Sequence, residues 1–216
     1  MTQKPKRVLL FANGELTSPE NIRPLLKGTD FLVAVDGGLK HLEALGLTPH
    51  LIIGDLDSAD AERIKKLRAH GVEIRTFSTD KNETDLHLAL EAALELAPEA
   101  IRVVAALGGR LDQTLTNIFL LTRADLAEVD IRLIDGNAEV ILIRKSAQLD
   151  GVIGQRVSLL PLNGPVTGIQ TDGLRYALNN EVLYPDQTRG ISNAMSTPTA
   201  KISVQTGLLL CIHETH

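Results

Sequence analysis

The sequence predicts an α/β fold, in which an N-terminal, mostly parallel, Rossmann-like α/β domain precedes a C-terminal antiparallel β-sandwich or barrel-like domain. Two observations lead to this prediction. In the first two thirds of the chain, short apolar runs of strand character alternate with amphipathic helical stretches, as in parallel sheets covered by helices. From about residue 139, short β-branched segments separated by Gly, Pro, Asn and Asp turns replace the helices.

The individual elements follow from these patterns. Strands are predicted at residues 7–12, 31–36, 50–55, 72–77, 101–107 and 131–136. Apolar residues recur at helical spacing in LKHLEALG, ADAERIKKLRAHG, ETDLHLALEAALELA and QTLTNIFLLTRADLA. Further strands are predicted at EVILIRK, QRVSLLPL, VTGIQTDGL, AKISVQTG and LLLCIHE. We therefore expect an α/β domain over residues 1–144 and a β domain over residues 145–216.

Composition limits the classes of function. The chain has 216 residues, 44% of them hydrophobic and 23% charged, which is ordinary for a globular protein. Its net charge of −5 disfavours general nucleic-acid binding, which needs clustered Lys and Arg. A single cysteine, Cys211 in an apolar segment, excludes an internal disulfide framework and predicts a buried thiol. No signal peptide or membrane span is recognised, so the expected compartment is the cytoplasm.

Polar residues gather where the predicted strands of the first domain end. The strand ends read VAVDGG, GDLDS, FSTDKNETD and ALGGRLDQ. Ligands of open α/β sheets bind beyond the carboxyl ends of the strands, and these ends lie at one edge of the sheet. That edge is expected to collect Asp36, Asp55, Asp57, Asp80, Lys81, Asp85, Arg110 and Asp112.

Structural roles would explain some of these residues singly. Asp57 or Ser58 could cap the helix that follows them, and Thr79 or Asp80 could cap a helix over residues 83–97. The Gly108–Gly109 pair could form a simple tight turn.

The whole set is better explained by a magnesium–nucleotide phosphoryl-transfer site. Clustered carboxylates repel one another unless a cation offsets their charge, and Mg²⁺ prefers carboxylate and phosphate oxygens. Gly-rich turns present backbone N–H groups to phosphate, and Lys81 and Arg110 would add positive charge. Neither a GxxxxGK[ST] loop nor a GxGxxG turn after the first strand is present, which disfavours P-loop kinases and dinucleotide-binding dehydrogenases.

The motifs resemble those of the thiamine pyrophosphokinase (thiamin diphosphokinase) family. The resemblance rests on VAVDGGLKHLEALGLTPHLIIGDLDS, TDKNETDLHLAL, GGRLDQTLTNIFLL, TDGLRYAL and GISN, in that order, over roughly residues 30–210. It implies transfer of a pyrophosphoryl group from ATP to the hydroxyl of thiamine, with Mg²⁺ as cofactor. It also implies a homodimer in which the catalytic, ATP- and Mg-binding α/β domain of one subunit faces the thiamine-binding β domain of the other.

The resemblance also implies roles for individual residues. Metal and catalytic carboxylates would be Asp55, Asp57 and Asp85, and further catalytic groups would be Arg110 and Asp112. ATP would be bound by Asp36, Gly37, Gly38, Lys81, Thr84, Gly109, Arg110 and Gln113. Thiamine would be contacted by Ser192 and Asn193 of GISN, a segment that could equally be a plain β-turn.

The sequence departs from the family pattern at two points, and two other functions are compatible with it. Asn82 stands where many relatives have Asp, and the Trp-free chain offers only Met195 near GISN as a stacking partner for thiamine. The rivals are a pyrophosphokinase for another heterocyclic alcohol, such as a pterin, and a non-catalytic regulator that binds nucleotide or thiamine. His213 and His216, at the C-terminal end, are expected to fray and to have no metal-binding role.

Overall fold

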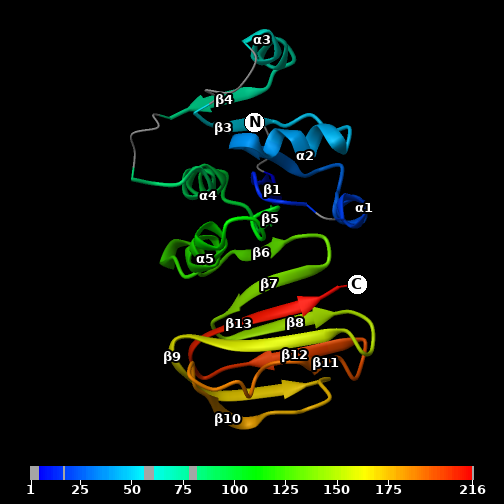
Figure 1. Cartoon of the computed structure of the whole chain (residues 1–216), viewed down its shortest axis with the longest axis vertical. Coiled ribbons are helices and arrows are strands. Elements are labelled where there is room, and N and C mark those ends of the chain that lie inside the picture. Colours follow the sequence, from blue (N-terminus) through cyan, green and yellow to red (C-terminus); the bar gives the residue numbers. More distant parts are fainter. Residues whose placement is uncertain (1–4, 17, 56–60, 78–81, 216) are drawn as a thin grey trace. The chain divides into compact units, whose positions relative to one another are not determined.

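The computed structural model describes residues 5–16, 18–55, 61–77 and 82–215. The chain divides into two compact units, of which the first comprises Met1–Leu120 and Glu128–Gly136. The second comprises Leu121–Ala127 and Asn137–His216, whereas the sequence pattern predicts a single boundary between residues 144 and 145. Parallel strands with helices in one unit and antiparallel strands in the other confirm the predicted combination of parallel α/β and antiparallel β structure (Figure 1).

The first unit is built on a parallel sheet. Within the described residues, its strands follow the order β4-β3-β2-β1-β5-β6. Their bounds are β1 Arg7–Phe11, β2 Phe31–Val35, β3 Leu51–Gly54, β4 Glu73–Thr76, β5 Ala100–Val104 and β6 Asp130–Ile134. Each one overlaps a predicted strand. β1 lies between β2 and β5, and Val8–Phe11 are accordingly buried, as expected for a central strand covered on both faces.

Helices connect these strands. They are α1 Pro19–Ile22, η1 Arg23–Leu25, η2 Asp36–Gly38, α2 Leu39–Ala44, α3 Ala61–Ala69, α4 Asp85–Glu95 and α5 Leu111–Leu120. Leu39 and Leu42 of α2 pack with Leu9 and Phe11 of β1 in one apolar cluster, while α4 packs against β2 and β3. The helix predicted at QTLTNIFLLTRADLA, residues 113–127, is shorter in the structure, because α5 ends at Leu120. Among the described helices none combines the length and apolar character needed to cross a bilayer.

The second unit is an antiparallel assembly with strand order β7-β13-β9-β12-β8, and β10 and β11 pair with β9. Its elements are η3 Ala124–Leu126, β7 Ala138–Ile143, β8 Ser146–Asp150, β9 Arg156–Asp172, β10 Asn179–Leu183, β11 Asn193–Ala194, β12 Thr199–Ser203 and β13 Thr206–Glu214. Its core includes Leu149, Ile169, Met195 and Cys211, all of them buried. The prediction of a buried thiol at Cys211 is therefore confirmed.

β9 corrects one prediction, since QRVSLLPL and VTGIQTDGL were expected to be separate strands. They form one strand of 17 residues that bends at Asn163 and Gly164, whose φ angles of 59° and 131° are positive. The first half of β9 pairs with β13, as in Leu159 opposite Cys211, and the second half pairs with β10 and β12. The Asn-Gly pair thus makes a bulge within a strand rather than a turn between two.

His213 is also placed differently from the expectation. It belongs to β13 and its side chain is completely buried, so it does not fray. Its Nδ1 lies 3.3 Å from Oε1 of Glu139, and its Nε2 lies 3.2 Å from Oε1 of Gln155. Pairing of β13 with both β7 and β9 holds this histidine inside the unit.

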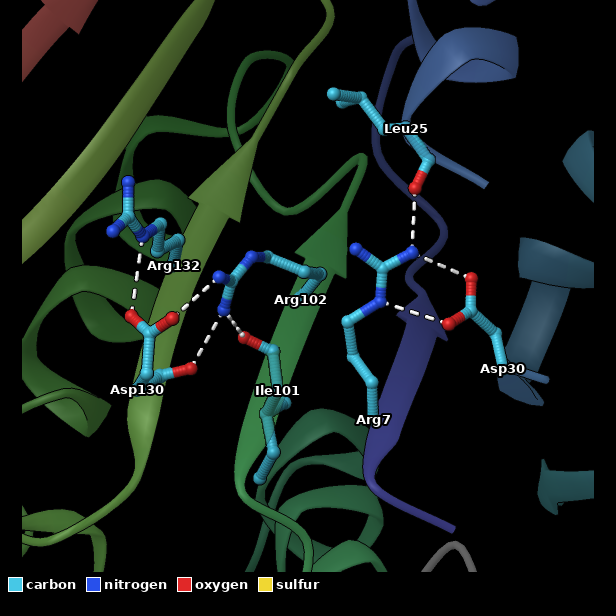
Figure 2. Close-up of polar contacts among 7 residues, drawn as sticks. All are labelled: Arg7, Leu25, Asp30, Ile101, Arg102, Asp130 and Arg132. Atoms are coloured by element: carbon cyan, nitrogen blue, oxygen red, sulfur yellow. Dashed lines mark hydrogen bonds and ion pairs between the residues drawn. The ribbon is translucent and has the colours of Figure 1, made fainter. Parts of the chain in front are cut away.

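An ion pair fixes the start of β1 to the start of β2 (Figure 2). Nε of Arg7 donates to Oδ1 of Asp30 at 2.8 Å and Nη2 donates to Oδ2 at 2.6 Å, while Nη2 also donates to the Leu25 carbonyl. The backbone N–H of Lys27 donates to the same carboxylate at 2.6 Å. Only 2% of the Asp30 side chain is exposed, so these donors replace the water that burial removes.

A second cluster joins the starts of β5 and β6 (Figure 2). Arg102 donates from Nη2 to Oδ2 of Asp130 at 2.5 Å, and Arg132 donates from Nε to Oδ1 at 3.1 Å. Burial lowers the pKa of Arg102, and the hydrogen bond to Asp130 opposes this effect. These charged groups lie at the edge of the sheet opposite to the strand ends that carry the predicted site.

The Arg7–Asp30 pair predicts a specific loss of stability. We expect Asp30→Ala to lower the free energy of unfolding by about 3 kcal/mol, because it leaves the largely buried Arg7 guanidinium without its counter-charge. Urea unfolding followed by circular dichroism would measure this. The control is Glu99→Ala, which removes the exposed Lys6–Glu99 pair and should change stability by less than about 1 kcal/mol. Equal effects of the two variants would contradict the prediction.

Candidate functional site

A cleft opens at the carboxyl ends of β1, β2 and β5 in the first unit. Its volume is about 390 Å³. Among the predicted site residues, the structure brings into its lining Asp36, Thr84, Asp85, Arg110, Asp112 and Gln113. These residues come from segments up to 77 positions apart, namely from Asp36 to Gln113, and the parallel sheet places them together because its strands end at one edge.

The turn after β2 shapes one wall of the cleft. Asp36 adopts a positive φ of 50°, a conformation that a non-glycine residue seldom takes. Gly38, two residues later, lies so close to β1 that a Cβ atom there would overlap the Phe11 carbonyl oxygen. The predicted Asp36-Gly37-Gly38 segment therefore places a carboxylate in the cleft and runs against the end of β1.

The start of α4 also lines the cleft. Thr84 is the N-cap, and its Oγ1 accepts a hydrogen bond from the backbone N–H of His87 at 3.3 Å. The sequence-based alternative placed this cap at Thr79 or Asp80, so Thr84 corrects it. Asp85 is the first residue of the helix, where the positive end of the helix dipole favours a carboxylate.

Arg110 and Asp112 form a pair at the mouth of the cleft. Arg110 donates from Nε to Oδ1 of Asp112 at 3.1 Å and from Nη2 to Oδ2 at 2.5 Å. The bonds from Arg110, followed by one from the backbone N–H of Gln113, hold the pKa of the Asp112 carboxyl below its ordinary value. The same bonds raise the pKa of Arg110, so both groups keep their charges across the physiological range.

Some lining residues were not predicted from the sequence, among them Asn13, Gly14, Thr116 and Asn117. Asn117 donates from Nδ2 to the Ala106 carbonyl at 2.8 Å and so holds α5 to the end of β5. Thr116 and Asn117 lie one helical turn after the predicted Asp112 and Gln113. Residues at this spacing share one face of a helix, so the sequence could have indicated that they line the same cleft.

A second hollow of about 550 Å³ adjoins the cleft and shares Asn13, Gly14, Gly108, Arg110 and Gln113 with it. Its other lining residues are Glu15, Leu16, Lys40, His41 and the predicted Gly109. Burial lowers the pKa of His41, and the positive charge of Lys40 lowers it further. The hydrogen bond to Gly14 acts in the opposite direction but is the smaller effect. A neutral His41 donates from Nε2 to the Gly14 carbonyl at 2.9 Å.

The predicted metal ligands are only partly described. Asp55 follows β3 and is half-buried, but it does not line the cleft as the described residues define it. Asp57 and Lys81 lie outside the described residues, as do Ser58, Thr79 and Asp80 of the capping alternatives. Within the described ranges no three His, Cys, Asp or Glu side chains are grouped to hold a metal ion.

The predicted thiamine residues lie in the second unit. Ser192 has a positive φ of 61°, and its backbone N–H donates to Oγ of Ser158 at 3.1 Å. Asn193 is buried and its amide is directed at the backbone of Tyr176: Oδ1 accepts from the Tyr176 N–H at 3.0 Å, and Nδ2 donates to the Tyr176 carbonyl at 2.8 Å. Met195 is completely buried, whereas 65% of Tyr176 is exposed.

A further hollow of about 670 Å³ lies on β8, β9, β10 and β12 of the second unit. Apart from Asp172 and Lys201 its lining is uncharged, and it contains none of the predicted residues. This hollow is larger than the cleft of the first unit. The cleft is nevertheless the better candidate for phosphate chemistry, because it combines three carboxylates with an arginine.

The contact between Gly38 and β1 predicts a local steric effect. Gly38→Ala should lower the free energy of unfolding by about 2 kcal/mol, because its Cβ must displace the Phe11 carbonyl. Gly28→Ala is the control, since a Cβ at Gly28 meets no atom within 4 Å. Thermal and urea unfolding of both variants measure the difference. Identical stabilities would show that the turn relaxes freely.

Comparison with known proteins identifies the family of this chain. Residues 22–154 match the family model "Thiamin pyrophosphokinase, catalytic domain", and residues 140–209 match "Thiamin pyrophosphokinase, vitamin B1 binding domain". The thiamine pyrophosphokinase of Bacillus subtilis (strain 168) is 30% identical over 203 residues, which cover 91% of this chain and 95% of that protein.

Solved structures give the same result. A crystal structure of thiamine pyrophosphokinase from Bacillus subtilis matches with a TM-score of 0.86 at 26% identity, over 98% of this chain and 100% of that one. A thiamin pyrophosphokinase family protein from Enterococcus faecalis matches with a TM-score of 0.81 at 26% identity, over 97% and 99% of the two chains. The motifs, the fold and both family models agree, and the chain belongs to the thiamine pyrophosphokinase family.

Proposed function

We propose that this chain transfers a pyrophosphoryl group from ATP to the hydroxyl of thiamine, giving thiamine diphosphate and AMP. The observation that carries the proposal is the cleft at the strand ends, which Asp36, Asp85, Asp112 and Arg110 line together in a chain of this family. The match of residues 140–209 to a vitamin B1 binding domain favours thiamine over a pterin as acceptor. Binding without catalysis would not require several carboxylates beside an arginine.

The reaction needs positioning and charge stabilisation more than covalent chemistry. The thiamine hydroxyl oxygen would bond to the β-phosphorus of ATP as the bond from that phosphorus to the oxygen shared with the α-phosphate breaks, and AMP leaves. The hydroxyl proton would pass to one of the carboxylates that line the cleft. Arg110 would exchange its bond to Asp112 for bonds to phosphate oxygens, since it can present two donors to either group.

Mg²⁺ suits the chemistry of the donors present. Carboxylates at neighbouring strand ends supply hard oxygen ligands, and Mg²⁺ sites are commonly completed by substrate phosphates rather than by the protein alone. Asp55, Asp57 and Asp85 would hold the ion. When bound, it would neutralise part of the charge on the phosphates. ATP would further contact Asp36, Gly37, Gly38, Lys81, Thr84, Gly109 and Gln113.

The second unit would supply the thiamine contacts. Ser192 would offer its hydroxyl, and Asn193 would act by fixing the backbone of Tyr176, because its amide is already bonded there. The exposed Tyr176 ring, which Asn193 fixes at its backbone, is an aromatic surface on which a thiamine ring could stack in this Trp-free chain. In this assignment residues 1–144 are the catalytic domain and residues 145–216 are the thiamine-binding domain.

We further propose that the enzyme is a homodimer with its active site at the subunit interface. Helix α5 exposes Leu111, Leu115 and Phe119, with 71%, 47% and 48% of their surfaces accessible, at intervals of four residues. Such an apolar stripe on one helix face is typical of an interface. It begins beside Arg110, so a second copy covering it would also approach the cleft.

The activity is tested by incubating the protein with ATP, Mg²⁺ and thiamine and identifying the products by mass. AMP and thiamine diphosphate should appear together in equal amounts. Asp85→Asn should lower kcat by about a hundredfold through loss of a charged metal ligand, with the fold retained by circular dichroism. Glu83→Gln, which removes an exposed carboxylate two residues away, is the control.

Two outcomes would contradict this proposal in different ways. Full turnover by a folded Asp85→Asn protein would remove Asp85 from the mechanism. ATP binding without thiamine-dependent AMP release would favour another acceptor, such as a pterin, or a non-catalytic regulator.

The interface is tested separately by Leu115→Glu, which places a charge in the middle of the α5 stripe. We expect the variant to sediment as a monomer where the wild type is a dimer, and to lose activity about tenfold or more. Leu25→Glu, at an exposed leucine of η1, should leave the dimer unchanged. A monomeric wild type with full activity would overturn the proposal.

A further inference from the structure

Asn13 connects the two hollows of the candidate site. It follows β1 and lines both the cleft and the adjoining hollow. Its Nδ2 donates to Oδ2 of Asp36 at 2.8 Å, and its Oδ1 accepts from Nζ of Lys40 at 2.9 Å. One amide therefore bridges a carboxylate in the cleft and a cation in the adjoining hollow.

These partners leave the amide a single orientation. If the Asn13 amide turned over, its NH₂ group would face the Lys40 ammonium and its oxygen would face the Asp36 carboxylate, so both contacts would become repulsive. Nζ of Lys40 also donates to the Asn13 backbone carbonyl at 3.2 Å. Lys40 thus holds both the main chain and the side chain of Asn13.

The backbone around Asn13 is equally well fixed. The N–H groups of Ala12 and Gly14, on either side of it, donate to the carbonyls of Val104 and Ala105 at 2.8 and 2.9 Å. The side chain occupies the space beside Gly37, where a Cβ atom would overlap the Asn13 amide. The glycine in the middle of the Asp36-Gly37-Gly38 turn therefore makes room for Asn13.

Asp36 needs such a partner because its own backbone is unfavourable. It holds a φ of 50° at the end of β2, so its side-chain direction depends on a turn that few residues adopt. The hydrogen bond from Asn13 gives the carboxylate one defined position in the cleft. Asn13 itself lies before residue 22, where the match to the catalytic family model begins.

We propose that Asn13 is a positioning residue for the nucleotide: it orients the Asp36 carboxylate in the cleft, and Lys40 acts through Asn13 by fixing its amide. The inference rests on the proposed function for the identity of the nucleotide, which is ATP with Mg²⁺. It assigns Lys40 an indirect role, distinct from that of a cation that contacts phosphate.

The test uses Asn13→Asp, which keeps the shape of the side chain but replaces the donor to Asp36 by an oxygen. The Kd of a non-hydrolysable ATP analogue, measured in the presence of Mg²⁺, should rise about tenfold, and so should the KM for ATP. This is the effect of losing one hydrogen bond to a charged group. The KM for thiamine should change by less than about twofold, a separation that a general loss of structure would not produce.

A double-mutant cycle tests the role of Lys40, whose side chain is exposed. Lys40→Met should weaken binding of the analogue about threefold in the wild type and have no effect in an Asn13→Ala background. Lys40→Arg should restore most of the affinity. Lys27→Met, at an exposed lysine away from the cleft, is the control for loss of positive charge.

Three results would overturn the inference: unchanged nucleotide affinity in Asn13→Asp, a parallel rise in the KM for thiamine, or a full Lys40→Met effect in the Asn13→Ala background. The last would show that Lys40 contacts the nucleotide directly. Binding of the analogue is measured without turnover, so the first and third results can be read even if thiamine is not the acceptor.

Discussion

The candidate site depends on one steric constraint, the close approach of the turn after β2 to the end of β1. Gly38 lies against the Phe11 carbonyl, and the adjacent Gly37 leaves space for the side chain of Asn13. Both contacts exist because two successive residues have no side chain. The parallel sheet brings the strand ends to one edge, and this approach places Asp36 in the same cleft as Asp85.

The fold was largely predictable where hydrophobic periodicity is strong and local. All the strands of the parallel sheet and the helices α2–α5 follow from alternation along the chain. β9 was not predictable as one strand, because Asn163-Gly164 has the sequence of a turn and only pairing with distant strands shows that the strand continues. His213 was misplaced for the same reason, since its burial comes from neighbours that are far away in the sequence.

The residues of the site that belong to a sequence motif could be predicted. The residues that hold them in place could not. Asp36, Asp85 and Arg110 follow strand ends, and topology alone assembles such residues. Asn13 and Lys40 were not predicted, because their proposed role comes from hydrogen bonds that join the end of β1 to η2 and α2. The inward direction of the Asn193 amide likewise depends on the loop around Tyr176, which no local rule specifies.

The order in which neighbouring strands are translated has a consequence for biosynthesis. In the first unit the central strand is β1, which leaves the ribosome before all the strands that pair around it. In the second unit β13 lies between β7 and β9, yet it is translated after both. The first sheet can therefore assemble while translation continues, whereas β7 and β9 must wait with open edges that chaperones would have to shield.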